Sequence, residues 1–245
     1  NYGDFAPGAL WEEPKYKFSA GAKHEVKEQM SQFLSGFAYE LPKITYNEEV
    51  KEHYALAVFK EIFGSNANGY HRMSQILREQ KGLVYFSGSG SLSYDKNGFL
   101  YTLSGTSFDK AREITETTVD LIRDFPATIT KEEVEIAKER ISNQLDQTCR
   151  PTIWVPMVAS EIGSTGKFTP MDKPLDLIAQ VTTDDVRKMA EEIFSQKPSF
   201  AAVSNHKAID ALPSLDEIHD RLDVSGAPDA GINISRTGFI TLFCF

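Results

Sequence analysis

Hydrophobic and polar residues alternate at a period of two from Ser19 to Leu41, as they do along β-strands. Gly21 and Pro42 bound this region, and its large apolar residues fall on one face: Phe33, Phe37, Tyr39 and Leu41. We therefore predict strand structure here, with one face turned toward a core.

The pattern then changes to the period of an amphipathic helix. Asn47 is a good N-cap and is followed by two glutamates, and a helical stripe of apolar residues runs to Gly64: Ala55, Val58, Phe59, Ile62 and Phe63. A shorter helix is predicted from about Tyr70 to Gln80, with Met73, Ile76 and Leu77 turned inward. Gly82 is suited to end it in the left-handed conformation.

A β-hairpin is predicted next, because Asn97-Gly98 separates two alternating runs that end near Gly105. Ser-Gly alternation at Gly88 to Gly90 indicates a bulge or a close backbone approach within the first strand. The remaining predicted elements are helices at about 108–125, from the capping box Thr130–Glu133, at about 151–162, from Thr182, and at 214–222, with a short strand at 200–203.

Strands joined by a hairpin, together with runs of amphipathic helices, predict the α+β fold class: an antiparallel sheet covered by a layer of helices. The length of 245 residues suits one domain, or two small ones that share a core. We divide the chain into an N-terminal arm or linker (1–18), a single α+β domain (19–223) and a C-terminal tail (224–245).

Composition narrows the classes of function. The net charge is −9, from 26 basic and 35 acidic residues, which argues against nucleic acid as a partner. The charge suits a basic peptide or protein partner, or simply a solvated acidic surface.

No apolar stretch approaches the roughly 18 residues needed to span a bilayer. No signal peptide is visible at the N-terminus, although the chain lacks an initiator Met and a removed targeting segment stays open. Cys149 and Cys244 lie far apart and predict no thiol or zinc-thiolate site.

The histidines provide no metal site. No two of them lie three or four residues apart, so no helix presents a paired zinc site. The segment His24 to Glu28 has the start of a metal motif but a glutamate where a second histidine is needed, and it is interpreted as an exposed strand. We assign no catalytic residue, no metal ligand and no cofactor within this chain.

Arg78 and Tyr85 are the candidate substrate-binding residues. Arg78 ends a predicted helix, Tyr85 opens a predicted strand, and Gly82 lies between them. This arrangement can aim a guanidinium and a phenol at one peptide carbonyl or developing oxyanion. In the alternative, Arg78 pairs with a helix carbonyl or with Glu79, and Tyr85 packs in the sheet. Residue types alone leave both interpretations open.

The segment from Arg72 to Tyr85 resembles the signature of the C-terminal half of insulinase/pitrilysin-family metallopeptidases. In that family, an arginine and a tyrosine at this spacing help hold the substrate backbone opposite the zinc. The resemblance therefore implies an α+β half-unit in which Arg78 and Tyr85 contact substrate. Segments 129–138, 149–151, 181–186 and 197–203 are similar to the mitochondrial processing peptidase branch and to core proteins of the respiratory cytochrome bc complex. Segments 212–218 and 235–237 look closer to its α, non-zinc type.

Two departures from the family pattern matter. The first half of the usual family chain, with its zinc motif His-x-x-Glu-His, is absent from this sequence. The segment from Gly64 to Gly69 is at best a shortened version of the Gly-rich loop of α-type subunits, which places a substrate-gripping role for it in doubt.

The resemblance implies a non-catalytic, core or substrate-binding component of a processing peptidase or of a cytochrome bc complex. Zinc would belong to a partner chain. The implied partners are an N-terminal half-unit, a zinc-bearing β-type subunit or cytochrome bc subunits, and the implied substrates are basic presequence peptides. Because a half-unit of this family buries a large face against its companion, we also expect exposed apolar surface on this chain and an obligate oligomer. The implied location is mitochondrial, in the matrix or on the matrix side of the inner membrane, with the bacterial cytoplasm as the alternative. A purely structural scaffold and an unrelated binding module are the competing hypotheses.

Overall fold

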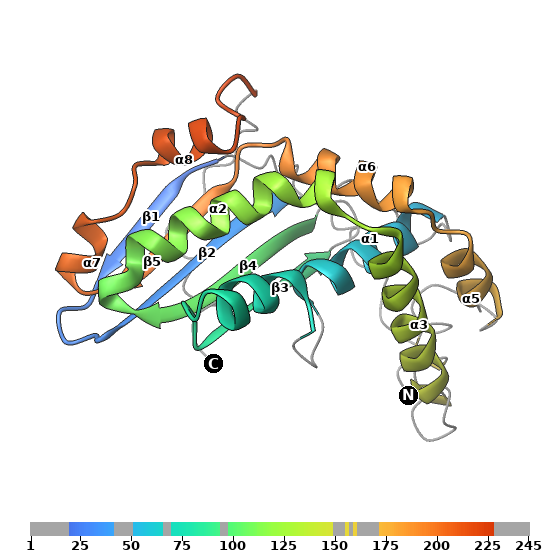
Figure 1. Cartoon of the computed structure of the whole chain (residues 1–245). Coiled ribbons are helices and arrows are strands. Elements are labelled where there is room, and N and C mark those ends of the chain that lie inside the picture. Colours follow the sequence, from blue (N-terminus) through green and yellow to red (C-terminus); the bar gives the residue numbers. More distant parts are fainter. Residues whose placement is uncertain are drawn as a thin grey trace, which may run out of the picture.

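The computed structural model describes residues 20–41, 51–65, 70–93, 98–148, 155–156, 159–160 and 172–227. Five strands form one sheet in the order β1-β5-β2-β4-β3. Helices α1, α2 and α6 lie across one face of this sheet, and the smaller α7 and α8 lie beside β1 and β5 (Figure 1). The predicted α+β class, with a sheet covered by a helix layer, is confirmed.

The strands are β1 (Ala22–Val26), β2 (Gln32–Glu40), β3 (Phe86–Ser93), β4 (Gly98–Ser107) and β5 (Ser199–Ser204). The helices are α1 (Lys51–Phe63), the π-helix η1 (Ser74–Gln80), the 3₁₀ turn η2 (Phe108–Lys110), α2 (Ala111–Thr128), α3 (Lys131–Thr148), α5 (Asp172–Ala179), α6 (Thr183–Phe194), α7 (His206–Asp210) and α8 (Leu215–Arg221).

The sheet is mixed rather than wholly antiparallel. Strand β2 pairs antiparallel with β4 and β5, and β3 and β4 form the predicted antiparallel hairpin. Strand β1, however, pairs parallel with β5. The region from Ser19 to Leu41 thus contains two strands, separated by a turn in which the Met30 N–H donates to the Lys27 carbonyl. Hairpin signals report only neighbours in sequence, so they carried no information about the distant β1–β5 pair.

Aromatic side chains join the helix layer to the sheet. Phe63 of α1 lies with its ring centroid 5.0 Å from those of Phe125 in α2 and Phe194 in α6. Phe194 in turn meets Tyr39 of β2 at 5.1 Å. All four residues are buried. Their burial explains the apolar stripes seen in the sequence, because each stripe faces the same core.

Several local predictions are confirmed at the ends of helices. Gly82 has φ +60°, the left-handed conformation expected of it. Thr182 caps α6 in a capping box with Asp185. The helix predicted to end near Phe125 instead runs to Thr128, through Pro126. Proline is tolerated in this last turn, where the Thr128 hydroxyl donates to the Asp124 carbonyl at 3.0 Å and the buried Phe125 holds the helix on the core.

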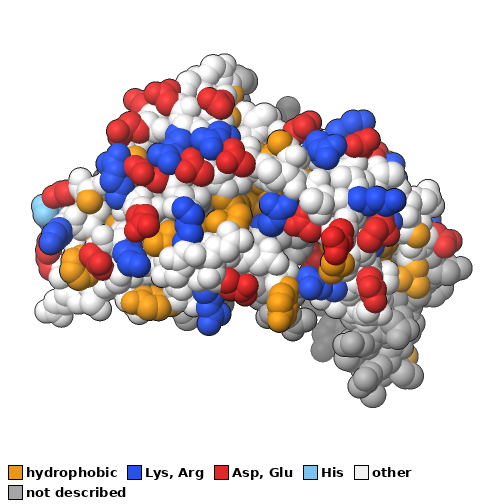
Figure 2. All heavy atoms as spheres, viewed as in Figure 1, with side chains coloured by type: hydrophobic (Ala, Val, Ile, Leu, Met, Phe, Trp, Pro, Cys, Tyr) orange, Lys and Arg blue, Asp and Glu red, His pale blue; other side chains and the backbone are white. Residues whose placement is uncertain are grey.

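Some predictions fall outside the described residues: the Asn47 cap, most of the Gly64–Gly69 loop, the hairpin turn before Gly98, most of the 151–162 helix, the N-terminal arm and nearly all of the C-terminal tail. Across the helices described, none is long and apolar enough to cross a membrane. The face shown in Figure 2 carries acidic and basic side chains interspersed. Ion pairs between charged side chains include Arg221–Asp120.

Candidate functional site

The turn from Arg78 to Tyr85 joins η1 to β3, and its backbone is closely determined. The Leu83 N–H donates to the Leu77 carbonyl at 2.8 Å, and the Gly82 N–H donates to the Arg78 carbonyl at 3.0 Å. These two bonds around a left-handed glycine reverse the chain direction where the helix ends. The Tyr85 N–H then donates to the Gly105 carbonyl at 2.8 Å, which attaches the start of β3 to β4.

Apolar anchors inside the turn leave its two candidate side chains exposed. Leu77, Leu83 and Val84 are buried in the core. Arg78 is exposed, and Tyr85 is 63% exposed. Neither side chain makes a hydrogen bond or an ion pair with any other part of the described structure, so the pairing of Arg78 with Glu79 or a helix carbonyl does not form. Both groups are therefore accessible to an external ligand, and their joint contact with a substrate stays a prediction.

The predicted short helix that carries Arg78 is a π-helix. Its last turn includes a bond from the Lys81 N–H to the Ile76 carbonyl at 3.2 Å, five residues back. Wider turns of this type are rare and occur frequently at functional sites. The buried His71 stands before the helix, and its Nδ1 accepts a hydrogen bond from the Ser74 N–H at 3.1 Å. Burial lowers the pKa of His71, which keeps this acceptor available.

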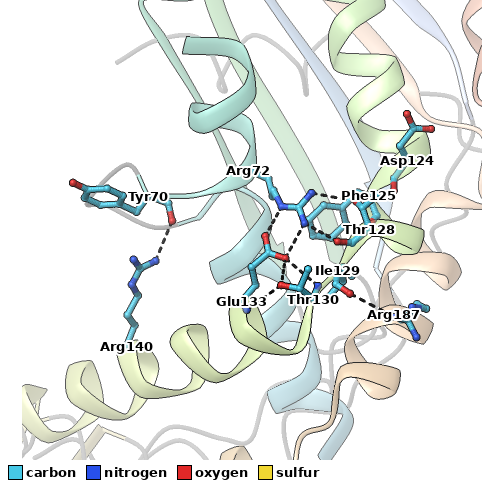
Figure 3. A network of polar contacts seen from close by, with 10 residues as sticks. All are labelled: Tyr70, Arg72, Asp124, Phe125, Thr128, Ile129, Thr130, Glu133, Arg140 and Arg187. Carbon is cyan, nitrogen blue, oxygen red and sulfur yellow. Dashed lines mark hydrogen bonds and ion pairs between the residues drawn. The ribbon is translucent and has the colours of Figure 1, made fainter. Parts of the chain in front are cut away.

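A second group of contacts holds the start of the same segment against the junction of α2 and α3 (Figure 3). We call Arg72, Thr128, Thr130 and Glu133 the Arg72 cluster. The guanidinium of Arg72 donates through Nε and Nη2 to both carboxylate oxygens of Glu133, the latter at 2.8 Å. It also donates to the Thr128 carbonyl at 2.7 Å and hydroxyl at 3.1 Å.

Glu133 has two functions in this cluster. Besides binding Arg72, it accepts the Thr130 N–H at 3.0 Å, which completes the capping box predicted for α3. Burial alone would raise the pKa of Glu133, but the hydrogen bonds from Arg72 and Thr130 outweigh it and hold the pKa below its ordinary value. Hydrogen bonds within the fold thus occupy both the carboxylate and the guanidinium. Arg72 therefore positions the start of the Arg72–Tyr85 segment and is not free to bind substrate.

A third group of contacts fastens β3 itself to the end of α1. The Ser89 N–H donates to the Gly64 carbonyl at 2.8 Å, and the Ser65 hydroxyl donates to the Ser89 carbonyl at 3.1 Å. A Cβ at Gly64 would lie 2.7 Å from Ser89 Oγ and 2.8 Å from Ser89 N, so only glycine permits this approach. Lys60 adds a hydrogen bond to Ser91 Oγ at 2.8 Å.

The glycines of the hairpin allow aromatic rings to lie flat against the strands. A Cβ at Gly90 would overlap the ring of Tyr101, and a Cβ at Gly105 would overlap the ring of Phe86. The close backbone approach predicted from the Ser-Gly alternation is found at Gly88, where a Cβ would lie 3.2 Å from the Gly64 carbonyl oxygen, whereas the neighbour at Gly90 is a side chain. Phe86 and Leu92 fall on the same face of β3 and are 50% and 40% exposed, so this strand carries exposed apolar side chains besides Tyr85, which precedes it.

In the described part of the chain, no three residues of the types His, Cys, Asp and Glu converge on a possible metal position. His24 lies in the exposed strand β1, as predicted. The sequence identified Arg78, Tyr85 and the Glu133 capping box, but not the partner of Glu133. Arg72 lies 61 residues away from it in sequence, and no local pattern signals such a pair.

Comparison with known proteins gives consistent results. Residues 3–141 match the family described as "Peptidase M16 inactive domain". The chain is 26% identical over 156 residues to the uncharacterized zinc protease YmxG of Bacillus subtilis, covering 62% of this chain and 37% of that protein. It is 26% identical over 146 residues to an uncharacterized zinc protease of Rickettsia felis, covering 58% and 34%. The chain thus spans about a third of the length of these relatives.

Two solved structures share the fold. A chain of Complex III2 from Candida albicans superposes with a TM-score of 0.65 and 12% identity, covering 83% of this chain and 49% of that one. A protease from Helicobacter pylori gives a TM-score of 0.64 and 14% identity, covering 83% and 48%. At these identities the likeness concerns the fold alone.

Proposed function

Because the chain belongs to the family of peptidase M16 inactive domains, we propose that it is a non-catalytic half-unit that binds an extended peptide through Arg78 and Tyr85. The zinc-bearing half would lie elsewhere in the same protein or in a partner chain. There the metal would polarise the scissile carbonyl. The residues of this chain would hold the peptide in place.

The observation that carries this proposal is the contrast between Arg78 and Arg72. Arg72 has its donors satisfied by Glu133 and Thr128, whereas Arg78 is exposed with no partner among the described residues. A guanidinium presents donors in a planar fork, and a phenol adds one more, so Arg78 and Tyr85 suit the carbonyls of a peptide main chain. Main-chain hydrogen bonds around the left-handed Gly82 fix the turn between them. Such pre-organisation lowers the entropic cost of binding.

The finer assignment is an α-type subunit of a mitochondrial processing peptidase, or a core component of a respiratory cytochrome bc complex. The fold likeness to a chain of Complex III2 supports this, and the likeness to bacterial zinc proteases supports a peptidase assembly. The net charge of −9 favours basic presequence peptides as substrates. We propose a location in the mitochondrial matrix or on the matrix side of the inner membrane, with the bacterial cytoplasm as the alternative.

The exposed apolar residues beside Tyr85 support an oligomer. Tyr85, Phe86 and Leu92 are all exposed at or near β3. Large apolar side chains that are exposed on the isolated chain are available for contact with other chains or ligands. We propose that the companion half-unit or the bound peptide covers them.

The second candidate is a structural scaffold within the respiratory complex, with no substrate role. The shared fold with a chain of Complex III2 favours it, because an assembly subunit needs the shape of the half-unit and not its binding residues. Under this hypothesis the Arg78 and Tyr85 side chains do not bind a peptide.

The test uses the native assembly with its zinc-bearing half and a basic presequence peptide. The Arg78→Ala and Tyr85→Phe variants are expected to lower kcat/KM by about 10- to 100-fold, the loss typical of a hydrogen bond from a charged or well-placed donor. Arg112→Ala is the matched control, since Arg112 is an exposed arginine paired with Glu116 on α2. Cleavage at wild-type rate by both variants would exclude the substrate role and leave the scaffold.

A further inference from the structure

Strand β1 forms an edge of the sheet, and half of its main-chain groups point away from the protein. The Phe200 N–H donates to the Gly21 carbonyl at 2.8 Å, and the Lys27 N–H donates to the Ser204 carbonyl at 2.7 Å. In a parallel pair, the residues that bond to the neighbouring strand alternate with those that do not. Residues 21, 23, 25 and 27 therefore bond toward β5, and Ala22, His24 and Val26 direct their N–H and C=O groups outward.

These outward groups have no partner in the described structure. All five residues of β1 are exposed, and Val26 is 45% exposed. An unpaired row of this kind is a template for another strand. A strand paired there would satisfy main-chain groups that no described residue of this chain bonds.

The sequence of β1 is complementary to itself when reversed. Read as Ala-Lys-His-Glu-Val, it has His24 at the centre, Lys23 and Glu25 on either side, and apolar Ala22 and Val26 at the ends. In an antiparallel pair of two copies centred on His24, each Lys23 would face a Glu25 of the second copy. Each Ala22 would likewise face a Val26.

The main-chain pattern is compatible with this register. The outward-pointing residues of one copy would meet those of the other as His24 with His24 and Ala22 with Val26, which are the hydrogen-bonded pairs of an antiparallel ladder. Lys23 and Glu25 would then form the non-hydrogen-bonded pairs, in which side chains approach most closely. We propose that β1 is a homotypic docking edge, where two copies of this chain join their sheets antiparallel about a two-fold axis at His24.

The pairing would stop at two copies. A two-fold contact uses the same edge on both chains and so closes on itself. The opposite edge of the sheet, β3, has its centre occupied at Ser89 by Gly64 and Ser65. Glu25 already pairs with Lys27 at 3.4 Å on its own strand, and it would gain Lys23 of the second copy as a second partner. Since one strand pair is a small contact, we expect a reversible dimer.

Charge reversal tests the register. Analytical ultracentrifugation of the full chain over a range of concentrations is expected to show a dimer, with Lys23→Glu and Glu25→Lys each raising its Kd by about tenfold, because each places like charges face to face twice per dimer. The double variant Lys23→Glu/Glu25→Lys is expected to restore the wild-type Kd. Mixing the two single variants is expected to give a heterodimer tighter than either homodimer, since all four facing charges are then opposite.

A disulfide test reports the position of the axis. In a chain with Cys149 and Cys244 replaced by Ser, His24→Cys is expected to form a covalent dimer under mild oxidation, because equivalent residues on the axis would have Cα atoms about 5.5 Å apart. Glu132→Cys on α3 is the matched exposed control and is expected to stay monomeric under the same oxidation. A wild-type chain that sediments as a monomer up to about millimolar concentration, unrestored dimerisation in the double variant, or equal cross-linking at positions 24 and 132 would each overturn the proposal.

Discussion

The two edges of the sheet lie on the same scaffold but are protected in opposite ways. At β3, the end of α1 covers the strand: Gly64 accepts the Ser89 N–H, and Ser65 donates to the Ser89 carbonyl. At β1, no described residue bonds to the outward groups of Ala22, His24 and Val26. Edge strands of folded proteins are normally covered, charged or kept short, because a bare edge pairs with other chains. Here one edge is covered, and the other is short and carries alternating charge.

Under the two proposals above, the two edges of the sheet have separate roles. The covered edge also carries the Arg78–Tyr85 turn, held by buried Leu77 and Leu83 and by the Arg72 cluster. The rigid environment suits a site whose side chains must be held in position for a ligand. The bare edge has no such support and suits pairing with another strand. The contrast can be tested by weakening each support in turn.

The largest effect on stability is expected where the end of α1 covers β3. Gly64→Ala would place a methyl group 2.8 Å from the Ser89 N atom, so α1 and β3 would have to separate. We expect a loss of about 2 to 3 kcal/mol in the free energy of unfolding, the cost of overpacking a close contact. Urea denaturation measures it.

Gly21→Ala, beside β1, is the matched control. A Cβ there meets nothing within 4 Å, so we expect a change between zero and about 1 kcal/mol of stabilisation, from the reduced entropy of the unfolded chain. Equal effects of the two substitutions would mean that the cover of β3 contributes nothing to stability.

The next largest effect is expected at the Arg72 cluster. Arg72→Ala removes a bidentate ion pair whose side chains are only 17% and 26% exposed, and it leaves the Thr128 carbonyl without its donor. We expect a loss of about 2 kcal/mol, measured by urea denaturation. Arg112→Ala, which breaks an exposed helical pair with Glu116, should cost no more than about 0.5 kcal/mol.

Because Arg72 positions the Arg78–Tyr85 turn without being free to bind substrate, its loss should also expose the segment to solvent. Amide hydrogen exchange across 74–86 should accelerate in Arg72→Ala and not in Arg112→Ala. Unchanged protection would show that the turn is held by its apolar anchors alone.

The pH dependence of stability should be smaller and should run through Glu133. Its folded pKa lies below the unfolded value, so the ionised carboxylate binds its partners fully above the unfolded pKa. This contribution is lost as the pH falls through the unfolded value toward the folded one. The cost of Glu133→Gln, from unfolding curves between neutral and acid pH, should therefore shrink on acidification. A constant cost across this range would contradict the assigned pKa.

The smallest effect is expected at Glu61, on the buried side of α1. Burial raises its pKa, while Arg140, with Nη1 4.0 Å from the carboxylate, partly opposes the shift. A carboxylate with a raised folded pKa costs stability above that pKa, and the cost vanishes below the unfolded pKa. Glu61→Gln should therefore stabilise the fold at neutral pH by up to about 1 kcal/mol and have no effect in acid. Destabilisation at neutral pH would show that the contact with Arg140 outweighs burial.

The features that could be predicted from the sequence are those formed by residues close together along the chain. The capping box at Thr130, the helix start at Thr182 and the left-handed Gly82 were all expected from the sequence, because each involves residues a few positions apart. The stripe of α1 was also expected, since burial on one side of a helix leaves a period in the sequence. The extension of α2 through Pro126 was missed, because packing of Phe125 in the core outweighed a local signal to stop.

The sequence by itself determined the α+β class, the hairpin and the helix caps, because these depend on local conformation. Arg78 and Tyr85 became candidates through their positions around Gly82 and through a family resemblance, and their contact with substrate stays a prediction. Only the tertiary structure decided that β1 joins β5 in parallel and that Arg72 binds Glu133 while Arg78 has no partner among the described residues. It also decided that the described residues cover the β3 edge of the sheet and not the β1 edge. These outcomes depend on contacts between residues far apart in the chain. Such contacts are set by how the layers pack, and they leave no periodic signal in the sequence.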